Sequence, residues 1–326
     1  MVSGMWTFAS LRKRLEKTKA ELEELQRQKA EREAREQASE IFKEPQSASD
    51  QSLFEDRSSL FADRGWLQPT RDPSDSFPVG RETYVNALAK LLTPALSGGG
   101  GRNVYVVGPP GTGKTLTVRY VLAKLTEHAR NTGITVHVAY VNAGRTRNPY
   151  FTLLDICRSI GVNAPPSGWQ FTRLKEAFEK TRGDEAMVVA IDEADAVILK
   201  VREPLIYYLN RQPKVIILLI TNWWDNLVGL PARARSTLQL APLIFKPYTL
   251  EEAKRILQPR AARAFKAGAV DEEILGKAAG FAAEAEDIRV GFNVLLTAGM
   301  LAEAQGRSRL DLVDLERAEA AIRPTL

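Results

Sequence analysis

The sequence predicts an α/β fold in which a five-stranded parallel sheet is followed by an all-helical region. Five short apolar segments between residues 103 and 248 alternate with stretches of helical periodicity, which is the pattern of a parallel sheet covered by helices. After Tyr248 the apolar residues recur at helical spacing and no strand pattern remains. A glycine-rich segment, GPPGTGKT, lies directly between the first strand and the helix that follows it.

The composition bounds the class of protein. A chain of 326 residues suggests two or three domains, and it contains no run of about 18 apolar residues that could span a membrane. One cysteine excludes an internal disulfide framework, and two scattered histidines make a zinc site improbable. A net charge of +5 favours an acidic partner such as nucleic acid. We expect a cytoplasmic, nucleoid-associated protein.

The N-terminal part has no sheet pattern. Residues 1–44 predict a charged helical arm, in which Phe8, Leu11, Leu15, Leu22 and Leu25 form a heptad-like stripe. Because the stripe covers fewer than three heptads, a short coiled coil and a solvated single helix both remain open. Residues 45–76 are rich in Ser, Asp, Pro and Gln and predict a linker.

Residues 77–247 predict the nucleotide-binding core. The segment RETYVNALAKLLTPAL has apolar residues at helical spacing and ends at four consecutive glycines, 98–101. The predicted strands are NVYVV (103–107), ITVHVAYVN (134–142), MVVAID (187–192), KVIILLITN (214–222) and LIFKPY (243–248). Residues 248–326 predict an all-α lid with helices near 250–267, 271–285, 287–304 and 311–322, the first opened by a capping box of Thr249 and Glu252.

GPPGTGKT fits the pattern of a phosphate-binding loop, and its place between a strand and a helix supports that interpretation. Gly111 and Gly113 let backbone N–H groups converge on phosphate, Lys114 reaches the β- and γ-phosphates, and Thr115 offers a hydroxyl to Mg²⁺. We therefore expect ATP or ADP with Mg²⁺ as cofactors. The predicted nucleotide-binding residues are Pro109, Pro110, Gly111, Thr112, Gly113, Lys114, Thr115, Leu116 and Arg81.

Polar residues end three more strands. Asp192 and Glu193 follow the buried segment MVVAI, and we expect Asp192 to hold Mg²⁺ and Glu193 to deprotonate the attacking water. Asn222 ends KVIILLITN and could hold that water. Asn142 ends HVAYVN, and either restrains Glu193 until a partner binds or is a plain turn residue.

Together, the phosphate loop, the DEAD segment, the strand-end asparagine and the helical lid resemble AAA+ ATPases. Within them the chain is most similar to the origin-recognition initiator ATPases of archaeal and eukaryotic replication. Four stretches carry the resemblance: FPVGRETYVNAL (77–88), YVNAGRTRNPYFTLLDICRSIGV (140–162), TNWWDNLVGLPARARSTL (221–238) and FKPYTLEEAKRIL (245–257). The resemblance covers roughly residues 60–322.

The resemblance implies further roles. Arg233 matches the arginine that reaches a neighbouring subunit's ATP site, with Arg235 as the backup. Arg289 looks like the lid arginine that contacts γ-phosphate, although Glu286 stands where the family has glycine. Arg145 and Arg147 match a region that meets duplex DNA in the family, while a solvated basic loop is the other interpretation.

The implied function is an initiator-type ATPase that acts on double-stranded DNA. The implied protein partners are neighbouring AAA+ subunits and a replicative helicase. The family normally continues with a winged-helix domain after the lid, and this sequence ends at Leu326 shortly after it. Other functions therefore stay open: an AAA+ regulator of transposition, a clamp-loader-like ATPase, or a nucleotide-gated protein adaptor without DNA contact.

Overall fold

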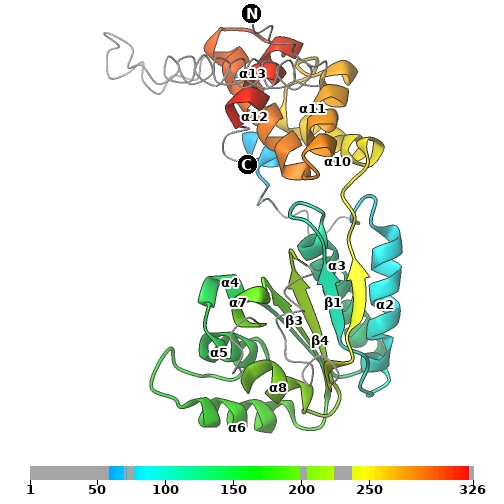
Figure 1. Cartoon of the computed structure of the whole chain (residues 1–326), viewed down its shortest axis with the longest axis vertical. Coiled ribbons are helices and arrows are strands. Elements are labelled where there is room, and N and C mark those ends of the chain that lie inside the picture. The colour runs from blue at the N-terminus through cyan, green and yellow to red at the C-terminus, as the bar shows by residue number, and fades with distance from the viewer. Residues whose placement is uncertain (1–58, 70, 72–76, 199–203, 224–236, 323–326) are drawn as a thin grey trace, which may run out of the picture. The chain divides into compact units, whose positions relative to one another are not determined.

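The computed structural model describes residues 59–69, 71, 77–198, 204–223 and 237–322 (Figure 1). The predicted arm over 1–44 lies outside these residues. The chain divides into two compact units. The core unit consists of Asp72–Arg255 and Ala283–Ile288. The lid unit consists of Ile256–Ala282, the chain from Arg289 onward and the described residues before Asp72.

The core unit is built on a parallel sheet of five strands, which confirms the predicted fold class. The strands run in the order β2-β3-β4-β1-β5, and each neighbouring pair is parallel. Their bounds are β1 Val104–Val107, β2 Val136–Asn142, β3 Ala186–Asp192, β4 Val215–Thr221 and β5 Ala241–Ile244.

The last strand differs from its prediction. It covers Ala241–Ile244 rather than 243–248, and it pairs with β1 as an edge strand. An edge position tolerates Pro242, which cannot donate to a central ladder. Phe245 and Tyr248 resemble strand residues in the sequence, but they are buried after the strand has ended.

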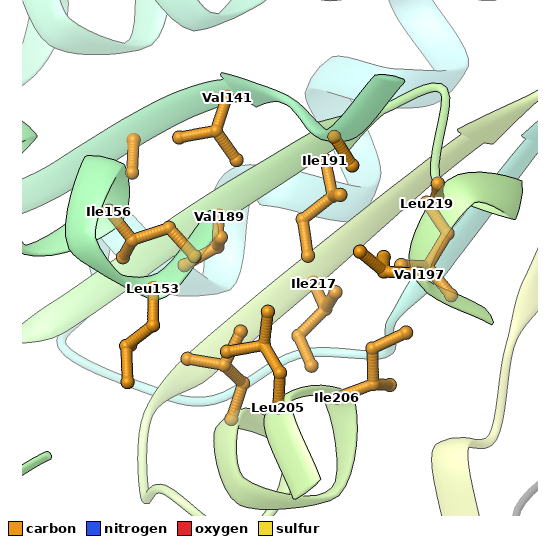
Figure 2. Close-up of a cluster of buried hydrophobic side chains, with 14 of the residues drawn as sticks. Val141, Leu153, Ile156, Val189, Ile191, Val197, Leu205, Ile206, Ile217 and Leu219 are labelled. Atoms are coloured by element: carbon orange, nitrogen blue, oxygen red, sulfur yellow. The ribbon is translucent and has the colours of Figure 1, made fainter. Parts of the chain in front are cut away.

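Helices cover both faces of the sheet (Figure 1). One face packs against α2 and α3, and the other against α5, α6, α7 and α8. Figure 2 shows the second apolar layer, in which β3 and β4 contribute Val189, Ile191, Ile217 and Leu219. The core-unit helices are α2 Glu82–Leu96, α3 Lys114–Thr132, α4 Ala143–Thr146, α5 Pro149–Ser159, α6 Phe171–Arg182, α7 Asp195–Ile198 and α8 Pro204–Asn210.

The burial of the central strands determines where polar side chains can reach a ligand. Every residue of β3 and β4 is buried, as expected for central strands with both faces covered. Polar side chains are therefore concentrated where the strands end. Because the strands are parallel, their carboxyl ends meet at one edge of the sheet, which is where open α/β sheets bind ligands.

The lid unit contains most of α10 Leu250–Ala264, followed by α11 Glu272–Glu284, α12 Ile288–Ala304 and α13 Leu312–Ile322. The predicted capping box at the start of α10 is confirmed: Thr249 N donates to Glu252 Oε2 at 2.8 Å, and Glu252 N donates to Thr249 Oγ1 at 3.3 Å. In the described part of the chain, the helices lack the combination of length and apolar character that crossing a membrane requires.

Part of the predicted linker over 45–76 is packed structure, so that assignment is wrong for residues 59–69 and 71. Phe61 stacks on Phe265 with ring centroids 4.7 Å apart, and the Ser59 hydroxyl donates to Glu303 Oε1 at 2.6 Å. The Trp66 ring lies within 4.4 Å of the Arg263 guanidinium. The turn η2, Arg64–Leu67, therefore docks this segment onto the lid helices.

Candidate nucleotide-binding and hydrolysis site

The phosphate loop joins β1 to α3 as predicted. Gly111 and Gly113 have φ values of 68° and 80°, in the left-handed region that favours glycine. Gly113 is the N-cap of the 19-residue helix α3, and a Cβ atom there would overlap the Tyr248 hydroxyl. The loop therefore needs glycine for both conformation and space, and the helix N-terminus behind it favours an anion.

Lys114 lies at the start of α3 and is 6% exposed. Its Nζ donates to the carbonyl oxygens of Gly108 at 2.7 Å and Pro109 at 2.8 Å. Thr112 Oγ1 also donates to Pro109 O, at 2.8 Å. The loop thus holds the ammonium group against its own backbone carbonyls, and the contact of Lys114 with phosphate stays a prediction.

Asp192 ends β3 and meets Thr115 from α3. The Thr115 hydroxyl donates to Asp192 Oδ2 at 2.7 Å, and the backbone N–H of Glu193 donates to Asp192 Oδ1 at 2.9 Å. A carboxylate and a hydroxyl beside a phosphate loop are the oxygen donors that Mg²⁺ uses together with substrate phosphates. The donor set therefore fits the predicted Mg²⁺, with Thr115 and Asp192 as the residues that would hold it.

Tyr140 is a member of this cluster that sequence reasoning missed. Its hydroxyl donates to Asp192 Oδ2 at 2.6 Å, and burial, followed by the charge of Asp192, raises the pKa of this phenol. The group therefore remains a hydrogen-bond donor near neutral pH. In the sequence, Tyr140 looks like an apolar residue of a buried strand.

Glu193 follows Asp192 with a φ of 49°, an unusual backbone conformation for a residue other than glycine. Asn142 Nδ2 donates to Glu193 Oε1 at 3.1 Å, because β2 and β3 pair in a register that places Asn142 opposite Asp192. A Cβ atom at Gly144 would overlap the same carboxylate. The structure thus shows the Asn142–Glu193 contact, while leaving its regulatory role a proposal.

Asn142 has a second partner. Its Oδ1 accepts a hydrogen bond from Arg145 N at 3.1 Å and so caps α4. One amide side chain therefore contacts Glu193 with its nitrogen and the Arg145 turn with its oxygen.

Asn222 follows β4, the strand between β1 and β3. A small network supports this strand end: the Thr221 hydroxyl donates to Tyr105 Oη at 2.8 Å, and Tyr105 Oη donates to Trp223 O at 2.9 Å. The fold places Asn222 at the end of the strand beside the phosphate-loop strand, as predicted. Its contact with an attacking water stays a prediction.

Arg81 is 2% exposed and contacts backbone groups around the loop. Its Nε donates to Thr112 O at 2.9 Å, and its Nη2 donates to Lys246 O at 2.9 Å. The guanidinium carbon lies 3.5 Å from the centre of the Tyr248 ring. Arg81 therefore ties the phosphate loop to the segment after β5, and its predicted contact with nucleotide stays untested.

The remaining predicted residues belong to several segments of the chain. Arg145 lies in the short helix α4 and Arg147 is its C-cap, and both are exposed. Arg289 is the second residue of α12 in the lid unit, and Arg233 and Arg235 lie outside the described residues. Pro109, Pro110 and Leu116 lie in the loop and the first turn of α3, where they were predicted.

Two family models match the chain. Residues 78–218 match an AAA ATPase domain, and residues 254–320 match a Cdc6 AAA+ ATPase-type lid domain. The first range lies within the predicted core, 77–247, and the second within the predicted lid, 248–326.

Curated relatives that match most of the chain agree with the family models. The chain is 33% identical to ORC1-type DNA replication protein 1 of Archaeoglobus fulgidus over 81% of its length and 65% of the relative's. It is 31% identical to the protein of the same name from Sulfurisphaera tokodaii, over 82% of this chain and 68% of the relative's. The chain thus spans about two thirds of the length of these curated relatives.

A solved structure supports the same relationship. The Aeropyrum pernix ORC1 protein, determined in complex with DNA, superposes with a TM-score of 0.70 at 31% identity. The superposition covers 82% of this chain and 71% of that chain. Fold, lid and sequence identity agree, and the chain belongs to the family of ORC1-type DNA replication proteins within the AAA+ ATPases.

Proposed function

We propose that the chain binds ATP with Mg²⁺, hydrolyses it slowly, and uses it as a switch that controls action on duplex DNA during replication initiation. The observation that carries the proposal is the cluster at the carboxyl edge of the sheet. There Thr115 and Asp192 share a hydrogen bond beside the phosphate loop, and Glu193 is held next to them by Asn142.

The loop binds and orients the triphosphate. Its backbone N–H groups and the N-terminus of α3 face the phosphates, and Lys114 pairs with their β- and γ-oxygens. Mg²⁺, when bound to Thr115 and Asp192, supplies charge neutralisation on the phosphate oxygens. Ordering the phosphates in this way aligns the γ-phosphate for attack by water.

Glu193 is the general base in this proposal. Its carboxylate accepts a proton from the attacking water, and Asn222 orients that water from the end of β4. The hydrogen bond from Asn142 occupies Glu193 Oε1, which restrains the base and keeps basal hydrolysis low. Release of that contact increases the hydrolysis rate.

Two arginines complete the site in the assembled form. Arg233 enters the ATP site of a neighbouring subunit, where a guanidinium supplied in trans stabilises the charge of the transition state. Arg289 on the lid contacts the γ-phosphate of its own subunit. Both roles come from the family resemblance, and both require neighbouring AAA+ subunits or lid closure.

Duplex DNA is the proposed macromolecular partner. Arg145 and Arg147 are exposed on one turn, where guanidinium groups can bind phosphate without reading sequence. The relative from Aeropyrum pernix forms a complex with DNA. A replicative helicase is the partner that would receive the ATP-dependent switch, with the protein acting at the nucleoid in the cytoplasm.

A mixing experiment tests the assembly. Arg233→Ala keeps an intact pocket but lacks the arginine for its neighbour, and Lys114→Ala lacks the pocket but keeps the arginine. Each variant alone should hydrolyse ATP poorly, and mixing them should restore part of the activity. Specific activity of the unmodified protein should rise with its concentration, most visibly with DNA. A flat dilution series together with an unimpaired Arg233→Ala would contradict the assembly.

Binding to duplex DNA in ATP and in ADP tests the switch. We expect footprints whose strength differs between the two nucleotides. Filaments on any duplex would instead favour a transposition regulator, and complete indifference to DNA would favour a protein adaptor.

A further inference from the structure

Among the described residues, three groups of different kinds donate hydrogen bonds to the Asp192 carboxylate. Thr115 donates from the helix that follows the phosphate loop, Glu193 donates through its backbone, and Tyr140 donates from the neighbouring strand. Thr115 is itself a proposed Mg²⁺ ligand, and the Glu193 N–H belongs to the next residue in the chain. Tyr140 is thus the donor that supports Asp192 from another strand without being a proposed ligand.

We propose that Tyr140 is a positioning residue for Mg²⁺: it fixes the orientation of the Asp192 carboxylate and thereby sets the affinity of the nucleotide site for the metal. This inference rests on the proposed binding of ATP with Mg²⁺. It adds a residue to that site whose hydroxyl acts through Asp192 and does not contact metal or nucleotide.

The register of the sheet explains why a tyrosine can do this. Tyr140 on β2 lies opposite Ala190 on β3, and Asn142 lies opposite Asp192. Tyr140 and Asp192 are therefore two positions apart along the strands and on the same face of the sheet. The Tyr140 hydroxyl reaches Asp192 Oδ2 at 2.6 Å.

The ring is itself held in place. It packs against the apolar layer beneath α2 and α3, and the Arg119 guanidinium carbon lies 5.4 Å from the ring centre. Arg119 is four residues after Thr115, so both side chains project from the same face of α3. The helix that carries one proposed Mg²⁺ ligand thus also packs on the tyrosine that orients the other.

The expected loss of Mg²⁺ affinity follows from removing the phenol hydroxyl that hydrogen-bonds the Asp192 carboxylate. An unperturbed phenol has a pKa near 10, so it donates a hydrogen bond at neutral pH. Removing a partner that orients a metal-binding carboxylate typically costs about 10- to 100-fold in metal affinity. Because the loop, Lys114 and the helix N-terminus remain, binding of nucleotide without metal should be unaffected.

The test is the Mg²⁺ dependence of nucleotide binding in Tyr140→Phe. A fluorescent ATP analogue is titrated onto the full chain in EDTA and then over a range of Mg²⁺ concentrations. Tyr207→Phe is the matched control, since it makes the same chemical change at an exposed position of α8. Thermal unfolding without nucleotide establishes that each variant is folded.

We expect Tyr140→Phe to raise the Mg²⁺ midpoint at least about tenfold while leaving the affinity in EDTA unchanged, and Tyr207→Phe to change neither. In an Asp192→Asn background, Tyr140→Phe should produce little further shift, because its effect passes through that carboxylate.

Three results would overturn the inference. They are an unchanged Mg²⁺ midpoint in Tyr140→Phe, an equal loss of affinity with and without metal, and a full additional shift in the Asp192→Asn background. If the unmodified protein bound the analogue without any Mg²⁺ dependence, the proposed function would fail as well. A Mg²⁺-dependent parent with an unaffected Tyr140→Phe would refute the positioning role alone.

Discussion

Replacing Asn142 by serine should separate its two contacts. Serine is a good N-cap, so the start of α4 is retained, but its side chain is too short to hold Glu193. A hydrogen bond contributes about 0.5–1.5 kcal/mol net. At 3.1 Å and in an exposed setting, the Asn142–Glu193 bond belongs in the lower half of that range. If the free energy with which this hydrogen bond restrains Glu193 falls by about 0.5–1 kcal/mol, basal ATP hydrolysis should increase about two- to fivefold.

The assay is steady-state ATP hydrolysis by Asn142→Ser at saturating nucleotide, with and without duplex DNA. Asn148→Ser is the matched control, because Asn148 caps α5 by accepting a hydrogen bond from Tyr150 N at 2.8 Å. It should leave the rate unchanged. A rate for Asn142→Ser that equals or falls below that of the parent would refute the idea that this contact restrains the base.

Two further predictions concern stability and DNA. Glu286 has a φ of 55°, so Glu286→Gly should relieve left-handed strain of about 1–2 kcal/mol, offset by the flexibility that glycine adds to the unfolded chain. Urea unfolding should show a net gain of about 0.5–1 kcal/mol in the free energy of unfolding. The control Glu284→Gly, at the end of helix α11, should lower the free energy of unfolding. A lower free energy of unfolding in both variants would contradict the reasoning. Arg145→Gln with Arg147→Gln should weaken DNA binding equally across sequences and reduce the slope of log affinity against log salt by about 2. An unchanged slope would exclude both arginines as phosphate contacts.

Much of the fold could be predicted because central strands of a parallel sheet have a distinctive sequence. The strands β3 and β4 are buried throughout, so their apolar runs are unambiguous. The edge strand β5 is harder to locate from the sequence, because it pairs with β1 alone in the described sheet and because buried apolar residues continue after the strand has ended. Phe245 stacks on Tyr84 rather than continuing the strand.

The segment formed by residues 59–69 and 71 shows a second limit of prediction from the sequence. Its buried residues, Leu60, Phe61 and Leu67, are few and follow neither a helical nor an alternating pattern, so no periodicity reveals them. They are buried because the lid helices provide a surface, with Gly299 leaving room for the Phe61 ring. Such docking depends on residues more than 200 positions away, which local pattern cannot show.

The site divides in the same way. The meeting of Thr115 with Asp192 beside the phosphate loop could be predicted, because the spacing of residues within short motifs reflects the chemistry. Tyr140 could not be identified, because its hydrogen bond to Asp192 depends on the register between β2 and β3. A tyrosine in an apolar segment predicts only a buried ring.

The central claim is that this edge of the sheet hydrolyses ATP with Glu193 as the base, and Glu193→Gln tests it most directly. An amide retains the size of the side chain and accepts a hydrogen bond, but it cannot take a proton. The measurement is ATP binding and single-turnover hydrolysis by the same preparation in the presence of Mg²⁺. We predict that Glu193→Gln binds ATP as tightly as the parent while hydrolysis falls by at least about a hundredfold. Hydrolysis at close to the parent rate, with ATP binding intact, would show that Glu193 is not the base and would contradict the account.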